Sequence, residues 1–164
     1  MNKHKLPRVL RLDDSDLQVF ELAATPGELA VPGGFEFLQD SIEALEGKRL
    51  QAFSHGFLGI TSFGRSTLVA IACLNSEAYQ NAVNQLSVNI FLHLGAPDRS
   101  LALNAAREEI KYAESLCEFE EGTILAVNRV YTDEQIKESY QKFVPATSAD
   151  WEQSKPLVYS FEED

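Results

Sequence analysis

The segment 59–66, Gly-Ile-Thr-Ser-Phe-Gly-Arg-Ser, has the spacing of a phosphate-binding loop, except that arginine replaces the usual lysine. In such loops, backbone amides at the start of a helix hold the phosphate oxygens. The residues that follow, 66–74, are instead mostly apolar and include Val69 and Ile71, which is typical of a strand. We therefore predict a hairpin with its turn at Gly64-Arg65, and no nucleotide site.

Carboxylate and imidazole groups are the next candidates, because they bind metal ions. The segment 13–16, Asp-Asp-Ser-Asp, could hold a hard cation, but the glycine and the bidentate glutamate of a calcium-binding loop are missing. The three histidines, His4, His55 and His93, have no spacing that a zinc or di-iron site uses. We expect a solvated turn at the acidic cluster, and neither a metal nor a cofactor.

Nucleophilic catalysis needs a serine or cysteine beside a base, and the chain offers no such arrangement. There is no GxSxG sequence, and Cys73 and Cys117 fall on predicted buried faces, where a thiolate is disfavoured. The many glutamates between positions 108 and 121 lie on the polar side of a predicted helix and in the residues that follow it. No catalytic residue is predicted.

One possible ligand site remains, formed by loop residues. His55 lies in Ser54-His55-Gly56, between a predicted helix and a predicted strand, where a loop can present a titratable ring. Ser62 and Arg65 would lie near it if the hairpin folds back over the helix end. The alternative hypothesis is therefore a small-molecule-binding protein or a small enzyme with this loop site, although a lone loop histidine is more often ordinary surface.

The elements that would position these residues follow from apolar periodicity and turn residues. The first half of the chain predicts an antiparallel meander, then a helix that starts at an Asp40 and Glu43 capping box, then the hairpin. The strands expected here are 7–12, 17–24, 29–37, 57–63 and 66–74, and the helix is 40–53.

The second half predicts mainly helices. Residues 76–94 repeat apolar side chains at three- and four-residue spacing, with Ser76 as N-cap and Gly95 as the stop, and Asp98 can cap a second helix to about residue 119. The short connection predicts that the two pack antiparallel. A strand at 123–131 and a third helix at 132–143, with a Thr132 and Gln135 capping box, complete the core.

Together these elements predict an α+β fold: a mainly antiparallel sheet of about five or six strands packed against three to four helices. The length suits a single domain at 1–145. The tail 146–164 is polar apart from Trp151 and an apolar patch that includes Phe161, and it can dock as an edge strand or stay loose.

Charge limits the partners. There are 14 basic and 25 acidic residues, so the net charge of −11 repels nucleic acid and anionic membrane surfaces. The longest apolar run, 68–74, is far shorter than the roughly 20 residues of a membrane span. Two unpaired cysteines and no secretion signal favour a cytoplasmic location. A homodimer through the sheet edge or the tail is compatible with this pattern.

Four stretches of the sequence resemble an uncharacterised proteobacterial family. They are residues 11–16 (RLDDSD), 32–35 (PGGF), 56–59 (GFLG) with 62–65 (SFGR), and 106–110 (AREEI) leading to 115–117 (SLC). The resemblance covers most of the chain and implies a bacterial cytoplasmic protein, but it brings no established activity and no functional residue. With no catalytic constellation predicted, the leading hypothesis is a non-catalytic binding or accessory module that acts with an unidentified protein partner.

Overall fold

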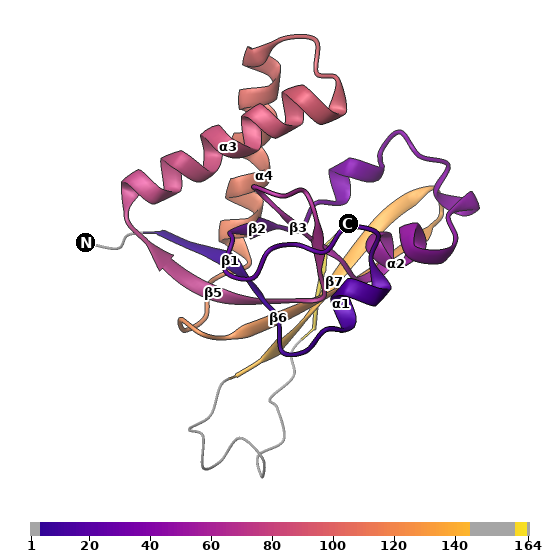
Figure 1. Ribbon diagram of the computed structural model, residues 1–164, viewed down its shortest axis with the longest axis horizontal. Coiled ribbons are helices and arrows are strands. Elements are labelled where there is room, and N and C mark those ends of the chain that lie inside the picture. Colours follow the sequence, from indigo (N-terminus) through magenta and orange to yellow (C-terminus); the bar gives the residue numbers. More distant parts are fainter. Residues whose placement is uncertain (1–3, 145–159, 164) are drawn as a thin grey trace.

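The computed structural model describes residues 4–144 and the backbone of residues 160–163. Figure 1 shows the resulting order of helices and strands, with α3 and α4 lying across one side of the sheets. The elements are β1 (His4–Leu10), α1 (Ser15–Val19), β2 (Ala30–Val31), η1 (Gly34–Phe37), η2 (Ile42–Ala44), α2 (Gly47–His55), β3 (Phe57–Gly59), β4 (Arg65–Ser66), β5 (Leu68–Leu74), α3 (Ser76–Leu94), α4 (Arg99–Ser115), β6 (Ile124–Thr132), β7 (Gln135–Phe143) and β8 (Ser160–Glu163). The predicted α+β class is confirmed.

The strands form two antiparallel sheets within the described residues. The larger has five strands in the order β1-β5-β6-β7-β8, and the smaller has three in the order β2-β3-β4. Strand β8 pairs with β7, so residues 160–163 lie at the edge of the larger sheet. Trp151 lies outside the described residues. A single sheet was expected, and the structure has two.

The two long helices follow the prediction closely. Helix α3 ends at Gly95 in the left-handed conformation, and Asp98 caps α4 by accepting a hydrogen bond from the Leu101 amide at 2.8 Å. The N-cap of α3 is Asn75, one residue before the predicted Ser76, because the Asn75 side chain accepts from the Ala78 amide at 2.8 Å. Both helices bury one apolar face against the sheets, as their periodicity requires.

The predicted third helix at 132–143 is wrong, because these residues form β7. Asp133 and Glu134 both have positive φ angles, 52° and 62°, and make a two-residue turn between β6 and β7. Such turns match the twist of paired strands, so the chain continues the sheet. Thr132 and Gln135 are therefore partners across the strands and not a capping box.

The predictions for the first half are also partly wrong. Residues 17–24 contain part of α1, residues 29–37 hold only the short β2 and a 3-10 turn, and the expected meander is absent because β1 pairs with β5. The helix predicted at 40–53 begins later, at Gly47. Gly, Pro and acidic residues interrupt these segments too often for long regular elements.

The predicted hairpin is confirmed in part. Strands β3 and β4 do pair, but the connection covers residues 60–64 and Arg65 belongs to β4. Residues 68–74 leave this hairpin and join the larger sheet as β5. Arg65 is consequently a buried strand residue with 4% of its surface exposed.

No helix in the described part of the chain is long and apolar enough to cross a membrane. Cys117 is buried, and burial raises the pKa of its thiol to about 12. It is therefore a packing residue, as predicted, whereas Cys73, which was also predicted to be buried, is only half-buried.

Candidate functional site

Two arginines are buried between the sheets and α2, and they organise this part of the molecule. Arg129 is 1% exposed and Arg65 is 4% exposed. Buried charges are costly unless they are paired and fully hydrogen-bonded. The contacts of these two side chains therefore show what the fold holds in place.

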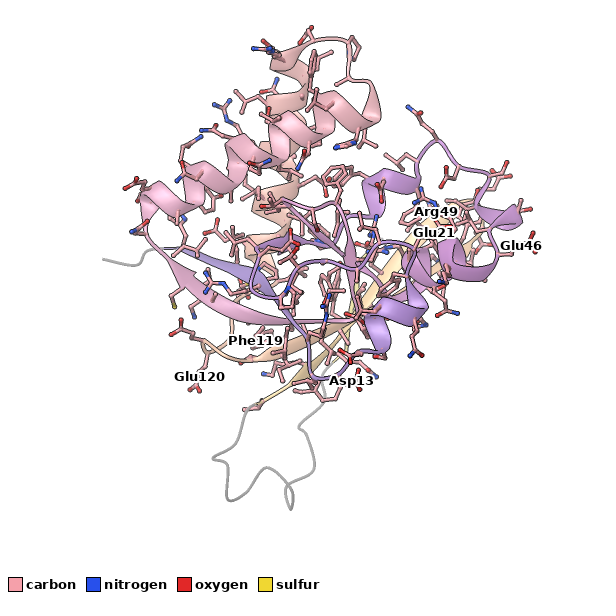
Figure 2. All side chains as sticks on the ribbon, in the orientation of Figure 1. Asp13, Glu21, Glu46, Arg49, Phe119 and Glu120 are labelled. Carbon is pink, nitrogen blue, oxygen red and sulfur yellow. The ribbon has the colours of Figure 1, made fainter. Side chains whose placement is uncertain are left out.

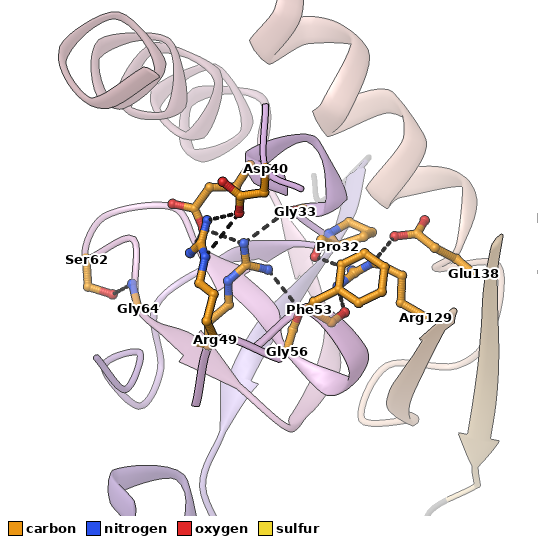
Figure 3. Close-up of polar contacts among 12 residues, drawn as sticks. Pro32, Gly33, Asp40, Arg49, Phe53, Gly56, Ser62, Gly64, Arg129 and Glu138 are labelled. Atoms are coloured by element: carbon orange, nitrogen blue, oxygen red, sulfur yellow. Dashed lines mark hydrogen bonds and ion pairs between the residues drawn. The ribbon is translucent and has the colours of Figure 1, made fainter. Parts of the chain in front are cut away.

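Arg129 comes from the middle of β6 and faces inward. Its Nε donates to Glu138 at 2.6 Å, and its terminal nitrogens donate to the backbone oxygens of Phe53 at 2.5 Å and Pro32 at 2.8 Å (Figure 3). A longer bond of 3.4 Å reaches the Gly56 oxygen. One guanidinium thus ties the end of α2 to the loop that follows β2.

Arg65 likewise donates hydrogen bonds to two backbone oxygens and one carboxylate. It donates to the Gly56 oxygen at 3.0 Å, to the Gly33 oxygen at 3.1 Å and to the Glu36 carboxylate at 2.5 Å. Its guanidinium lies 4.7 Å from the centre of the Phe37 ring. Burial lowers the pKa of Arg65 to about 10, so the side chain keeps its charge at neutral pH.

The Pro32-Gly33-Gly34 sequence lets the loop approach both arginines. Gly33 has a φ of 79°, and a Cβ there would lie 2.4 Å from Leu58 Cβ and 3.0 Å from the Arg65 guanidinium. A Cβ on Gly34 would lie 2.9 Å from the Glu138 carboxylate. Glycine is therefore required by close contact, and the loop from Gly33 to Asp40 is held from both sides.

The Glu138 carboxylate, which binds Arg129, also belongs to a network of hydroxyl and carboxyl groups. The second oxygen of Glu138 accepts from Tyr112 at 2.7 Å and from Tyr140 at 2.9 Å, and the two hydroxyls are 2.9 Å apart. Burial raises the pKa of Tyr140, so it stays protonated. Glu138 is thus fully occupied by an arginine and two tyrosines.

A cleft of about 620 Å³ opens between the held loop and the α3–α4 pair. We use "the cleft" for this hollow. Its walls are apolar residues of the loop and both helices together with polar and charged side chains. The apolar ones are Phe35, Leu38, Ile90, Leu94, Ala96 and Ala105, and the polar and charged ones are Glu36, Gln39, Asp40, Arg49, His93, Glu108 and Glu109. An adjoining hollow of about 310 Å³ shares Phe35, Leu38 and Glu109 with it and reaches Tyr112 and Glu138.

Glu109 differs from the paired acids of this region, Glu36, Asp40 and Glu138. It is half-buried and lines both hollows, yet among the described residues it has neither an ion pair nor a hydrogen-bond partner. Burial, followed by the nearby charges of Glu138 and Glu108, raises the pKa of Glu109 to about 7. A carboxyl group with no hydrogen-bond or ion-pair partner among the described residues therefore faces an open cleft.

The raised pKa gives a stability prediction for Glu109→Gln. Since the folded-state pKa is about 7 and the ordinary value is 4.5, Glu109 costs no stability below pH 4.5, destabilises the protein progressively as pH rises from 4.5 to 7, and destabilises it by a constant amount above that. Glutamine resembles the protonated form. We expect the variant to be about 2 kcal/mol more stable than the parent at pH 8, after allowance for solvent screening, and equal to it near pH 4.5.

Urea unfolding at the two pH values measures this difference. Glu120→Gln is the matched control, because Glu120 is exposed and lies at the edge of the molecule far from Arg49 of the cleft (Figure 2). The same gain for Glu109→Gln at both pH values would show that ionisation of Glu109 is not its cause.

The residues predicted from the sequence are divided between different places. His55 is exposed at the end of α2 and lines a separate hollow on the larger sheet with Thr67 and Asn128. Ser62 donates to Glu28 at 2.6 Å and accepts from the Gly64 amide at 2.9 Å, so it stabilises the β3–β4 connection. Of the three predicted residues, Arg65 is the one that holds the loop beside the cleft.

Sequence reasoning missed Arg129 and Glu138, and it placed Glu109 on the solvated face of its helix, whereas the structure half-buries it. The signal for Arg129 is visible in β6, where Leu125 and Val127 are buried and Arg129 continues the same face. Since β7 was predicted as a helix, its pairing partner Glu138 could not be placed. Within the described residues, no group of three His, Cys, Asp or Glu side chains is arranged to hold a metal ion.

Comparison with known proteins gives one match. A family of unknown function, DUF6505, matches residues 3–154, which is most of the chain. No curated protein and no solved structure matches. The resemblance to an uncharacterised family is therefore confirmed, and the family description indicates no activity.

Proposed function

Because the chain belongs to the family of unknown function DUF6505, whose description gives no activity, we propose from the site alone that it is a non-catalytic binding module. The proposed ligand is a small molecule with an apolar body, held in the cleft between the Gly33–Asp40 loop and the α3–α4 pair. The observation that carries this proposal is the cleft itself, about 620 Å³ in volume, with apolar walls from three separate elements. This volume is within the range of small-molecule sites.

The rigidity of the loop supports a binding role. Its backbone is held by Arg65 and Arg129, and Arg49 holds its far end through Asp40 at 2.8 Å (Figure 3). A wall fixed before binding loses little conformational entropy when the ligand arrives. The charged groups along it are mostly engaged with each other, which suits holding a ligand in place better than transferring protons or groups.

The cellular setting of this proposal comes from the sequence. An accessory role in the cytoplasm, with a protein partner that receives or supplies the ligand, agrees with the acidic surface and with the absence of a nucleic-acid-binding charge pattern. A homodimer is compatible with it.

The proposal predicts that small aromatic probes bind in the cleft. Three probes of similar shape are suitable: 2-phenylethylamine, 2-phenylethanol and 3-phenylpropanoate. We expect at least one to shift the backbone NMR signals of Phe35, Leu38 and Ala105 in a saturable manner. Leu38→Ser should weaken that probe about fivefold, because Leu38 is 71% exposed in the free protein and would be covered by the ligand.

Leu101→Ser is the matched control, since Leu101 is 51% exposed on α4 and is not among the residues of the cleft. It should leave the affinity unchanged. If none of the three probes shifts the signals of the cleft, or if both variants weaken binding equally, the cleft is not the binding site.

A further inference from the structure

We propose that the polar group recognised in the cleft is a positively charged nitrogen, an ammonium or guanidinium group on the apolar body, and that Glu109 is its counterion. This inference rests on the proposed function, because it names the ligand chemistry of the same cleft. It is argued from the pairing of the acids, the charge of the walls and the position of Glu109.

The first step is the pairing of the acids. Asp40 is bound by Arg49, and Glu36 is bound by Arg65, with Arg49 at 3.8 Å. In the adjoining hollow, Glu138 is bound by Arg129. These carboxylates already have cations. Glu109 has none among the described residues, although it is half-buried and lies where the two hollows meet.

The second step is the charge of the walls. Among the described residues, the cleft is lined by four acids, Glu36, Asp40, Glu108 and Glu109, and by one arginine, Arg49, and one histidine, His93. Glu36 and Asp40 are already paired with arginines. The charge that a ligand meets therefore comes from Glu109 and from the exposed Glu108, and an anionic ligand would be repelled by these two. A cationic ligand would be attracted by them, and would supply the missing partner of Glu109 without displacing an existing ion pair.

The third step is the shape of the ligand. Phe35, Ile90 and Leu94 provide apolar contacts beside the acids, so the cation must carry an apolar body. The volume fits a free small amine, and this is the source to which we commit. A lysine side chain presented by a partner protein has the same charge. The two sources can be distinguished by experiment, because a site for such a side chain would bind a lysine-containing peptide and not a free amine.

Ionisation of Glu109 makes binding depend on pH. The groups that act on its pKa are Glu108 on α4, Glu138 on β7 and Arg129 on β6, and His93 faces the same cleft from α3. A cation binds the ionised carboxylate, so the ligand must remove the proton at low pH. With a pKa of about 7 in the free protein, the affinity for the amine should fall about tenfold between pH 8 and pH 6.

Isothermal titration calorimetry of the full chain with the three probes tests this inference. At pH 8, we expect 2-phenylethylamine to bind at least about tenfold more tightly than 2-phenylethanol, and 3-phenylpropanoate to bind most weakly. Glu109→Gln should lower the affinity for 2-phenylethylamine to that for 2-phenylethanol, and the affinity for the amine should no longer depend on pH. Glu120→Gln should change neither. Because Glu109→Gln is expected to be more stable than the parent at pH 8, unfolding cannot explain its loss of affinity.

Other results would overturn the inference. If the alcohol binds in the cleft as tightly as the amine, the site selects shape alone, and the proposed function survives without its cation. If the carboxylate binds best and tightens as pH falls, Glu109 acts as a protonated donor to an anion. If the pH dependence persists in Glu109→Gln, it does not come from Glu109. If only a lysine-containing peptide binds, the free amine is excluded.

Discussion

Replacing Arg129 by methionine is expected to destabilise the protein by about 3–5 kcal/mol. Methionine fills a similar volume but donates no hydrogen bond. The substitution would leave the Glu138 carboxylate without its cation and the backbone oxygens of Pro32 and Phe53 buried without a donor. The loss should appear as a lower urea midpoint with an unchanged denaturant slope.

The control for this prediction is Arg107→Met. Arg107 is exposed on α4, and arginine and methionine have similar helix propensities. The expected change is within about 0.5 kcal/mol. If Arg129→Met also costs less than about 1 kcal/mol, water or local rearrangement replaces its bonds, and the guanidinium does not hold the loop. The double variant with Glu138→Gln should cost less than the sum of the single ones, because the carboxylate then carries no unpaired charge.

Long elements with a clear period were predictable from the sequence. The apolar repeat of 76–94 and the cap at Asp98 specify α3 and α4 locally, since helix periodicity and capping involve neighbours along the chain. Residues 124–132 alternate strongly enough to identify β6. These elements contribute most of the main core.

Residues 132–143 show where local evidence fails. Ile136, Tyr140 and Phe143 have helical spacing, but Tyr140 is buried because β7 pairs with β6 and covers the interior. The same residues satisfy a helix and an amphipathic strand, and only the long-range pairing decides between them. This error also hid Glu138, which faces Arg129 across the strand pair.

The candidate site was predictable only in part, for a related reason. Arg65 was identified from its turn-like sequence, although its burial depends on contacts with Gly33 and Glu36, which lie far away in the chain. Glu109 sits beside Glu108 on one helix, and nothing in the sequence separates the exposed acid from the half-buried one. That difference arises when the loop from Gly33 to Asp40 packs opposite α4.

The β3–β4 hairpin supplies the second large prediction. Gly64→Ala is expected to destabilise the protein by about 3 kcal/mol. A Cβ on Gly64 would lie 2.5 Å from the carbonyl carbon and oxygen of Ala23 and 2.6 Å from the Ala24 nitrogen. These are backbone atoms, held by bonds of 2.8 Å from Ala24 to the Arg65 oxygen and from Arg65 to the Leu22 oxygen. They can yield only if those bonds break.

Gly47→Ala separates this effect from backbone strain. Gly47 has a φ of 61° and no atom within 4 Å of the position of a Cβ, so alanine there should cost about 1 kcal/mol, from the left-handed conformation alone. Thermal unfolding of both variants should place Gly64→Ala well below Gly47→Ala. An equal loss would mean that the segment 22–24 moves aside easily. A larger loss for Gly64→Ala would indicate that this segment fixes β4, and with it the backbone of Arg65, whose side chain holds the wall of the cleft.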